Sequence, residues 1–317
     1  MATQRLCPAL NYFLAMRLRK IFHLDLQTRT LTLGERTLLM GVLNITPDSF
    51  SDGGKFLTPD RAIAQALALQ KAGADILDIG AESTRPGSTT ITAVEELRRL
   101  LPVLQSLRNQ LKIPISLDTR KATVAEIATG AGAEIINDVS GLNHDPRLAE
   151  VAARRKLPLI LTHMRGEPAT MQKAPFARNV MKDVTRGLRA SIKKARSAGV
   201  KNSQIILDPG IGFGKSFQQN YELLRRLPEL AKLGHPLLVG TSRKGFLGRT
   251  LAQAQPGTAH PKSNPVPPNQ RLWATAATLT ASILGGAHIV RVHDVTEMLQ
   301  VARVADLLLD PQKILAK

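Results

Sequence analysis

The 317-residue chain is poor in cysteine and in aromatic residues: it has one cysteine, Cys7, and only 3% of its residues are Phe, Trp or Tyr. A single cysteine cannot form an internal disulfide, so a cytoplasmic location is expected. Because no aromatic residues interleave with the basic clusters, we do not expect a platform that stacks single-stranded nucleic acid. No uninterrupted apolar stretch is long enough to cross a bilayer, and we expect no membrane association.

Acidic residues are also scarce. The chain has 25 Asp and Glu against 43 Lys and Arg, which gives a net charge of +18. This balance favours anionic partners such as phosphorylated metabolites, nucleic acids or acidic membrane surfaces. One group of basic residues recurs at helical spacing: Arg178, Lys182, Arg186, Arg189 and Lys193. We interpret this group as the solvated outer face of a helix, and we do not expect nucleic acid as a partner.

Three parts of the chain stand apart from the regular alternation of strands and helices described below. Residues 1–20 show no clear period and precede every motif, so we interpret them as a dispensable extension, with Met16 as a second possible start. From residue 21 to residue 38, two alternating stretches flank a polar turn and predict a β-hairpin. Residues 252–269 are rich in proline and predict an insertion in a surface loop.

In the rest of the chain, short apolar runs alternate regularly with helical stretches. Short apolar runs begin at Leu38, Ile76, Ile113, Ile135, Leu159, Ile205, Leu237 and Ile289. Helical stretches such as Asp60–Ala72, Val94–Gln110 and Asn220–Leu233 lie between them. Eight such units predict an α/β fold, a single (β/α)₈ TIM barrel over residues 21–312 with a short N-terminal β-hairpin. A doubly wound sheet is the alternative, but no glycine-rich dinucleotide fingerprint follows the first strand.

Each apolar run ends in polar residues, and in a barrel these ends meet at one mouth. Asp118, Asn137, Asp208 and Lys244 combine hydrogen-bond donors and acceptors. Such a set suits a flat heterocycle with several N–H and C=O groups, each of which needs a partner when it is buried. The sequence therefore predicts a heterocycle-binding pocket at the mouth.

A second set of residues suits an anion. Asn44, Arg291 and His293 offer donors and a neutral oxygen ligand, as expected for a diphosphate with Mg²⁺, which takes few protein oxygens besides phosphate oxygens and water. The histidines lack the spacing of a zinc site. The glycine-rich run Asp208–Lys215 lacks the Walker spacing of a phosphate loop.

Seven segments resemble the dihydropteroate synthase family: NITPDSFSDGG (44–54), DIGAESTRPGS (78–88), SLDT (116–119), INDVSG (136–141), DPGIGFGK (208–215), SRKGFLG (242–248) and RVHDV (291–295). The resemblance implies a transferase of folate biosynthesis that condenses 6-hydroxymethyl-7,8-dihydropterin diphosphate with p-aminobenzoate. The products would be 7,8-dihydropteroate and pyrophosphate. It also implies Mg²⁺ as cofactor, a homodimer and a sulfonamide target. The alternative is a barrel similar to a methyltetrahydrofolate:corrinoid methyltransferase, which has no use for the Ser83–Gly87 loop.

The resemblance assigns roles by position. The residues implied to bind the pterin are Asp118, Asn137, Met164, Asp208, Phe213, Gly240 and Lys244. The diphosphate would bind Asn44, Arg291 and His293, with Asn44 also a ligand of Mg²⁺. The aminobenzoate loops would contain Phe50, Ser51, Thr84, Arg85 and Pro86. The catalytic residues would be Asp118, Lys244, Arg291 and His293. One departure from the family pattern is Gly245, where many members have serine.

Overall fold

The computed structural model describes residues 19–46, 58–84, 88–168, 170–172, 176–254 and 264–314. Eight parallel strands form one sheet in the order β8-β7-β6-β5-β4-β3-β10-β9. A bridge between Leu207 and Leu237, beside β9, nearly closes the sheet into a barrel. The strands are β3 (Leu38–Asn44), β4 (Ile76–Gly80), β5 (Ile115–Asp118), β6 (Ala133–Asp138), β7 (Leu159–Thr162), β8 (Ile205–Asp208), β9 (Leu238–Val239) and β10 (Ile289–Val292). The predicted barrel is confirmed.

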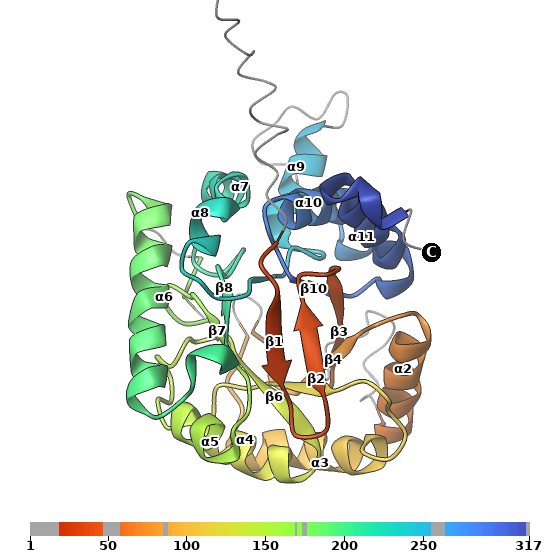
Figure 1. Ribbon diagram of the computed structural model, residues 1–317, viewed down its shortest axis with the longest axis vertical. Helices are drawn as coiled ribbons and strands as arrows, with labels where there is room; N and C mark the ends of the chain where they lie inside the picture. The colour runs from red at the N-terminus through yellow and green to blue at the C-terminus, as the bar shows by residue number, and fades with distance from the viewer. Residues whose placement is uncertain are drawn as a thin grey trace, which may run out of the picture.

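Helices surround the strands (Figure 1). They are α2 (Pro59–Lys71), α3 (Ala93–Leu107), α4 (Ala122–Gly130), α5 (Leu148–Arg155), α6 (Val180–Ser197), α7 (Phe217–Arg225), α8 (Leu227–Ala231), α9 (Gly245–Ala254), α10 (Leu272–Leu284) and α11 (Val295–Leu309). Short 3₁₀ turns are η1 (Asn202–Gln204), η2 (Pro268–Gln270) and η3 (Pro311–Ile314). The helical stretch expected over residues 220–233 is present as two helices, α7 and α8. It is divided at Arg226, because Pro228 occupies the first turn of α8 and has no N–H to continue α7.

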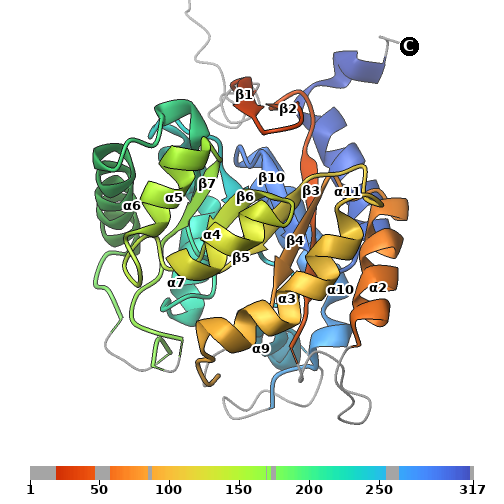
Figure 2. The same ribbon diagram turned by 90° about the horizontal axis from the view of Figure 1, so that it is seen from below.

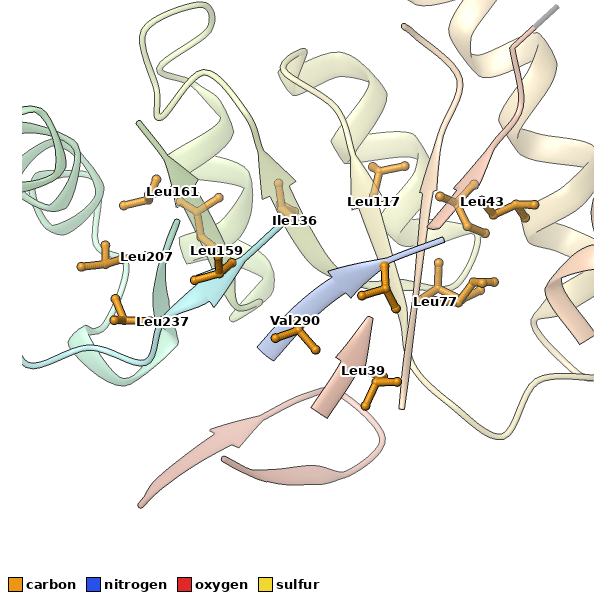
Figure 3. Packing of buried hydrophobic residues seen from close by; sticks show 14 of the residues in the cluster. Leu39, Leu43, Leu77, Leu117, Ile136, Leu159, Leu161, Leu207, Leu237 and Val290 are labelled. Carbon is orange, nitrogen blue, oxygen red and sulfur yellow. The ribbon is translucent and has the colours of Figure 1, made fainter. Parts of the chain in front are cut away.

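Alternate residues of each strand face the helices. Leu39, Leu77, Leu117, Ile136 and Leu161 belong to the large apolar cluster between the sheet and the helices (Figure 3). Since side chains alternate along a strand, their neighbours point into the barrel. These inner residues form a second apolar cluster, with members from seven of the eight strands: Leu38, Met40, Ile76, Ile135, Ile160, Ile206, Leu238 and Ile289. The barrel is therefore filled and is not a pore.

The predicted N-terminal hairpin is present as β1 (Phe22–Asp25) and β2 (Thr30–Leu33), which pair antiparallel. Its Leu24 and Leu33 are buried in the inner cluster. Figure 2 shows the hairpin at one end of the barrel and α9, which follows a strand end, at the other. The hairpin thus covers the amino-terminal end of the strands and leaves the carboxyl-terminal mouth to other residues.

Most of the N-terminal extension, and residues 255–263 of the proline-rich insertion, lie outside the described residues. The described end of the insertion is fastened to the barrel: the Val266 N–H donates to the Gly248 carbonyl at 3.0 Å, and Arg271 Nε donates to the Val266 carbonyl at 2.7 Å. No helix in the described part of the chain is long and apolar enough to cross a membrane.

Arg19 belongs to the barrel, although the sequence analysis placed it in the extension. Its Nη2 lies 2.5 Å from Asp306 Oδ1 on α11, and its Nη1 donates to Thr37 Oγ1 and to the Ala287 carbonyl, both at 2.7 Å. Both charged side chains are almost fully buried. Arg19 therefore connects the start of the described chain to its last barrel helix.

We expect Arg19→Ala to lower the free energy of unfolding by about 3 kcal/mol, because it leaves the buried Asp306 carboxylate without its main cationic partner. A chain that begins at Met16 keeps Arg19, and we expect it to unfold like the full chain. Chemical denaturation of both proteins provides the measurement. A large loss of stability in the chain that begins at Met16 would show that residues 1–15 pack on the barrel.

Candidate active site

The inner face of the barrel changes from apolar to polar toward the carboxyl-terminal ends of the strands. The inward positions of five strands carry Asp78, Asp118, Asn137, Asp208 and Arg291; Asp118 lies two residues beyond Ser116, and each of the others lies two residues beyond an isoleucine of the inner apolar cluster. Since parallel strands end at the same edge, these side chains form a polar layer at the carboxyl-terminal mouth. The alternation of the strands alone thus places the candidate site directly above the core.

Arg291 is the centre of this layer. Its Nε donates to Asp78 Oδ2 at 2.6 Å, and its Nη2 donates to Asp118 Oδ2 at 2.8 Å. Asp78 also accepts from Asn137 Nδ2, at 3.2 and 3.3 Å. The amide nitrogen of Asn137 therefore faces Asp78, and no donor among the described residues contacts its amide oxygen, which can accept from a ligand.

Asp78 is a site residue that the sequence analysis missed. It is fully buried inside β4 and not at the end of the strand, where the polar clusters were sought. The available signal was an aspartate within the apolar run Ile76–Gly80, at the same parity as Ile76 and hence facing the barrel interior.

Burial has the largest effect on the pKa values of the Asp118 and Asp208 carboxyls. Burial raises the pKa of Asp118 to about 7; Arg291 opposes this rise, and the negative charge of Asp78 adds to it. Burial also raises the pKa of Asp208, against a hydrogen bond from the Gly210 N–H at 2.7 Å. Both groups are shielded from water, so their charges act strongly on a ligand in the mouth.

Lys244 brings a buried positive charge to the same site. Its Nζ is 3.9 Å from the centroid of the Phe213 ring, a cation–π contact. Burial lowers the pKa of Lys244 to about 8; Arg291 lowers it further, while Asp208 and Asp118 oppose the shift. Gly212 has φ +84°, and a Cβ there would lie 3.1 Å from Lys244 Cδ. The glycine-rich loop thus approaches the lysine stem closely.

Lys215 holds the glycine-rich loop in place through His163. It is the second residue whose role was not predicted from the sequence. Lys215 is 2% exposed, and its Nζ donates to the His163 carbonyl at 2.7 Å and lies 2.9 Å from His163 Nδ1. Gly210 has φ +67°, and a Cβ there would lie 2.0 Å from the same carbonyl. Burial lowers the pKa of Lys215 to about 7, while Asp208 opposes the shift. Only glycine fits at position 210.

His293 is oriented by Ser242. The His293 N–H donates to Ser242 Oγ at 3.2 Å, and Ser242 Oγ lies 3.0 Å from His293 Nδ1. The Ser242 hydroxyl has one hydrogen to donate, and in the tautomer in which Nδ1 accepts it, Nε2 is the protonated ring nitrogen. His293 can then present an N–H to an anion.

The remaining predicted residues differ in how the structure places them. Asn44 ends β3 in register with Gly80, and Met164 is 9% exposed just after β7. A Cβ at Gly240 would make only ordinary contacts, the nearest 3.5 Å from Arg291 Cβ. Thr84 is half-buried just after β4. Phe50, Ser51, Arg85 and Pro86 lie outside the described residues.

The donor set fits a magnesium ion that is bound together with a diphosphate. Among the described residues no group of three His, Cys, Asp or Glu side chains could hold a metal ion by itself. Asn44 offers a neutral amide oxygen at the mouth, and Mg²⁺ commonly combines few protein oxygens with phosphate oxygens and water. A metal here would therefore depend on the anionic ligand.

Comparisons with known proteins agree with this geometry. The profile of the family described as pterin binding enzyme matches residues 40–293. A dihydropteroate synthase of Synechocystis sp. is 50% identical over 275 residues, which cover 87% of this chain and 91% of the relative. The structure of the Yersinia pestis dihydropteroate synthase with a sulfonamide drug complex is similar, with a TM-score of 0.82 and 39% identity over 93% of this chain and 100% of the other. That of Xanthomonas albilineans with 4-aminobenzoic acid has a TM-score of 0.80 and 39% identity over 94% of this chain and 100% of the other.

The barrel, the polar mouth and these matches define the class: the chain belongs to the pterin-binding enzymes. Within that family it belongs to the dihydropteroate synthases, transferases of folate synthesis.

Proposed function

We propose that the barrel mouth condenses 6-hydroxymethyl-7,8-dihydropterin diphosphate with p-aminobenzoate to give 7,8-dihydropteroate and pyrophosphate. The observation that carries this proposal is the linked set of Asp118, Arg291, Asp78 and Asn137 beside Asp208 and Lys244. The Xanthomonas albilineans relative, which binds 4-aminobenzoic acid, supports the second substrate. The relatives named above are dihydropteroate synthases, which favours this function over the corrinoid methyltransferase alternative.

The pterin is recognised by the buried polar layer. Asp208 and the amide oxygen of Asn137 accept from ring N–H and amino groups, and Lys244 donates to the ring carbonyl. Phe213 and Met164 pack around the ring. A ligand that lacked one of these groups would leave a buried partner unsatisfied, which costs more than a lost contact in water.

Charge development determines the chemistry. As the C–O bond to the diphosphate breaks, positive charge appears on the pterin and negative charge on the leaving group. The Asp118 carboxylate stabilises the positive charge, and Arg291 and the Nε2–H of His293 stabilise the negative charge. Mg²⁺, held by Asn44 and the phosphate oxygens, would neutralise further negative charge on the diphosphate. The amine of p-aminobenzoate then attacks the carbon and loses a proton, so no protein nucleophile is required.

The assay that tests the function is release of pyrophosphate from the pterin diphosphate. We expect release to depend on p-aminobenzoate and on Mg²⁺. It should fall to background with EDTA, because without the metal the negative charge on the departing diphosphate is not neutralised. Dihydropteroate is measured in the same reaction by chromatography. Equal rates of release with and without p-aminobenzoate would identify a hydrolase and overturn the proposal.

We infer that the chain forms a homodimer through α10 and α11. Residues 272–284 of α10 contain no charged residue, in a chain of net charge +18. The exposed side chains on these neighbouring helices include Trp273 (80% exposed), Val304 (61%) and Leu308 (56%). Apolar side chains of this size, gathered on adjacent helices, are typical of a face covered by another subunit.

Substitution by arginine tests the dimer. We expect Trp273→Arg combined with Leu308→Arg to convert the dimer into a monomer, because charged guanidinium groups would be buried without partners. Val94→Arg is the matched control, since Val94 is 78% exposed on α3, which lies apart from α10 and α11 (Figure 1). Sedimentation velocity measures the mass. If the Trp273→Arg/Leu308→Arg variant were a dimer like the Val94→Arg control, the interface would not be formed by α10 and α11.

A further inference from the structure

A buried ionic cluster lies beside the pterin residues and is not used by the proposed reaction. It joins Glu82, which follows β4, to Arg120 and Lys121, which follow β5, and to Glu96 of α3. Lys121 Nζ donates to Glu82 at 2.7 Å and to Glu96 at 2.5 Å, and Arg120 Nη2 donates to Glu82 at 3.2 Å. Glu96 and Arg120 are buried, and the side chains of Glu82 and Lys121 are only 6% and 13% exposed.

The basic neighbours of Glu82 favour its charged form. Burial raises the pKa of Glu82, but hydrogen bonds from Arg120 and Lys121 outweigh this effect and hold the pKa below its usual value. Arg120 is only 4% exposed and Glu96 is fully buried. Buried charges persist only where each has good partners, so these side chains are fixed in one arrangement.

Arg120 reaches beyond the cluster to two mouth loops. Its Nη2 also donates to Thr90 Oγ1 at 3.0 Å, and its Nη1 donates to Glu167 Oε2, after β7, at 2.8 Å. Glu82 and Thr90 bracket the segment that contains Thr84. A single guanidinium group thus contacts three separate parts of the mouth, which its planar set of donors allows and a lysine ammonium does not.

The two ends of this segment are also joined to each other. Ser88 Oγ donates to the Ser83 carbonyl at 2.6 Å, and the Ile91 N–H donates to Glu82 Oε1 at 3.2 Å. Glu82 therefore fixes the chain where it leaves β4 and where it returns toward α3. The Glu82 side chain is in turn held by Arg120 and Lys121.

We propose that Arg120 is a positioning residue for p-aminobenzoate: it holds Glu82 and Thr90, which lie on either side of Thr84 in the chain, against Glu167 after β7. This inference rests on the proposed function. The pterin residues Asp118, Asn137 and Asp208 lie on strands and are held by other contacts, including those of Arg291. Loss of the Arg120 contacts should therefore weaken binding of the second substrate and leave binding of the first unchanged.

Steady-state kinetics with each substrate varied separately test the proposal. Arg120→Lys keeps a positive charge beside Glu82 but cannot reach Thr90 and Glu167 together. We expect it to raise the KM for p-aminobenzoate about tenfold, as for the loss of charge-assisted hydrogen bonds, with the KM for the pterin diphosphate within about twofold. Glu167→Gln and Thr90→Val each remove one partner, and we expect each to raise the KM for p-aminobenzoate by about threefold.

Glu229→Gln is the matched control, because Glu229 is an exposed glutamate paired with Arg226 on α8. We expect its kinetic constants to equal those of the unmodified protein. If Arg120→Lys does not fold, Glu167→Gln and Thr90→Val decide alone. An unchanged KM for p-aminobenzoate in all folded variants, or a parallel rise in both KM values, would overturn the proposal. Failure of the unmodified protein to release pyrophosphate with p-aminobenzoate would instead overturn the proposed function.

Discussion

Lys244→Ala and Asp208→Asn should each lower kcat at least ~100-fold while the melting temperature changes little. Lys244 is held over Phe213 and interacts with Asp208 and Asp118, so its charge lies within the pterin pocket. Removing either charge alters the field in which the pterin cation forms, in a site shielded from water where such effects are large. Pyrophosphate release and circular dichroism of the same preparations provide the two measurements.

Lys193→Ala is the control for Lys244→Ala. Lys193 is exposed on α6 and has no hydrogen-bond or ion-pair partner among the described residues, so its loss removes one positive charge without touching the mouth. Its kcat should stay within about twofold of the unmodified value. Near-normal turnover of Lys244→Ala or of Asp208→Asn would be incompatible with the assigned pterin pocket.

Asp78→Asn has the second large expected effect. Asp78 is fully buried and is the shared acceptor for Arg291 and Asn137, so its charge fixes both side chains. We expect kcat/KM for the pterin diphosphate to fall about 100-fold, and the free energy of unfolding to fall by about 3 kcal/mol, because Arg291 loses one of its two carboxylates.

Asp138→Asn separates the two effects of Asp78→Asn. Asp138 is also fully buried, at the end of β6, but among the described residues it accepts only from the Ser140 side chain and from the backbone of Ser140 and Leu142. Its replacement should lower stability and leave the kinetic constants of the folded enzyme unchanged. If Asp138→Asn lost as much activity as Asp78→Asn, the loss would reflect a general loosening of the barrel and not a role of Asp78.

The strands could be predicted because each is short, apolar and bounded by turn residues. Every observed strand begins within two residues of its expected start, including Leu38, Leu159 and Ile289 at the same residue. Helix boundaries depend on single residues as well as on periodicity. The helical stretch expected over residues 220–233 is divided into two helices because Pro228 has no N–H to continue α7.

The site could be predicted only where polar residues stand at or near the carboxyl-terminal ends of the strands. Asp118, Asn137, Asp208 and Arg291 were found because each lies in such a cluster, and the structure brings them to one mouth. Contacts between Glu82 and Arg120, or between Lys215 and His163, join loops that are distant in sequence. A barrel makes loops of consecutive strands neighbours, but the sequence does not say which of their side chains pair, so these partners emerge only from the folded chain.

The hairpin that covers the barrel has a consequence for synthesis on the ribosome. Leu24 and Leu33 are made first, but their inner cluster includes Ile289 of β10, the strand made last. At typical translation rates the two are separated by on the order of ten to fifty seconds. During that time the hairpin cannot be fully buried, and Arg19 has no Asp306 to bind. Because β10 also carries Arg291, the same strand that completes the inner apolar cluster delivers the last residue of the polar layer at the mouth. A nascent chain of this protein therefore gains its closed barrel and its capacity for catalysis together.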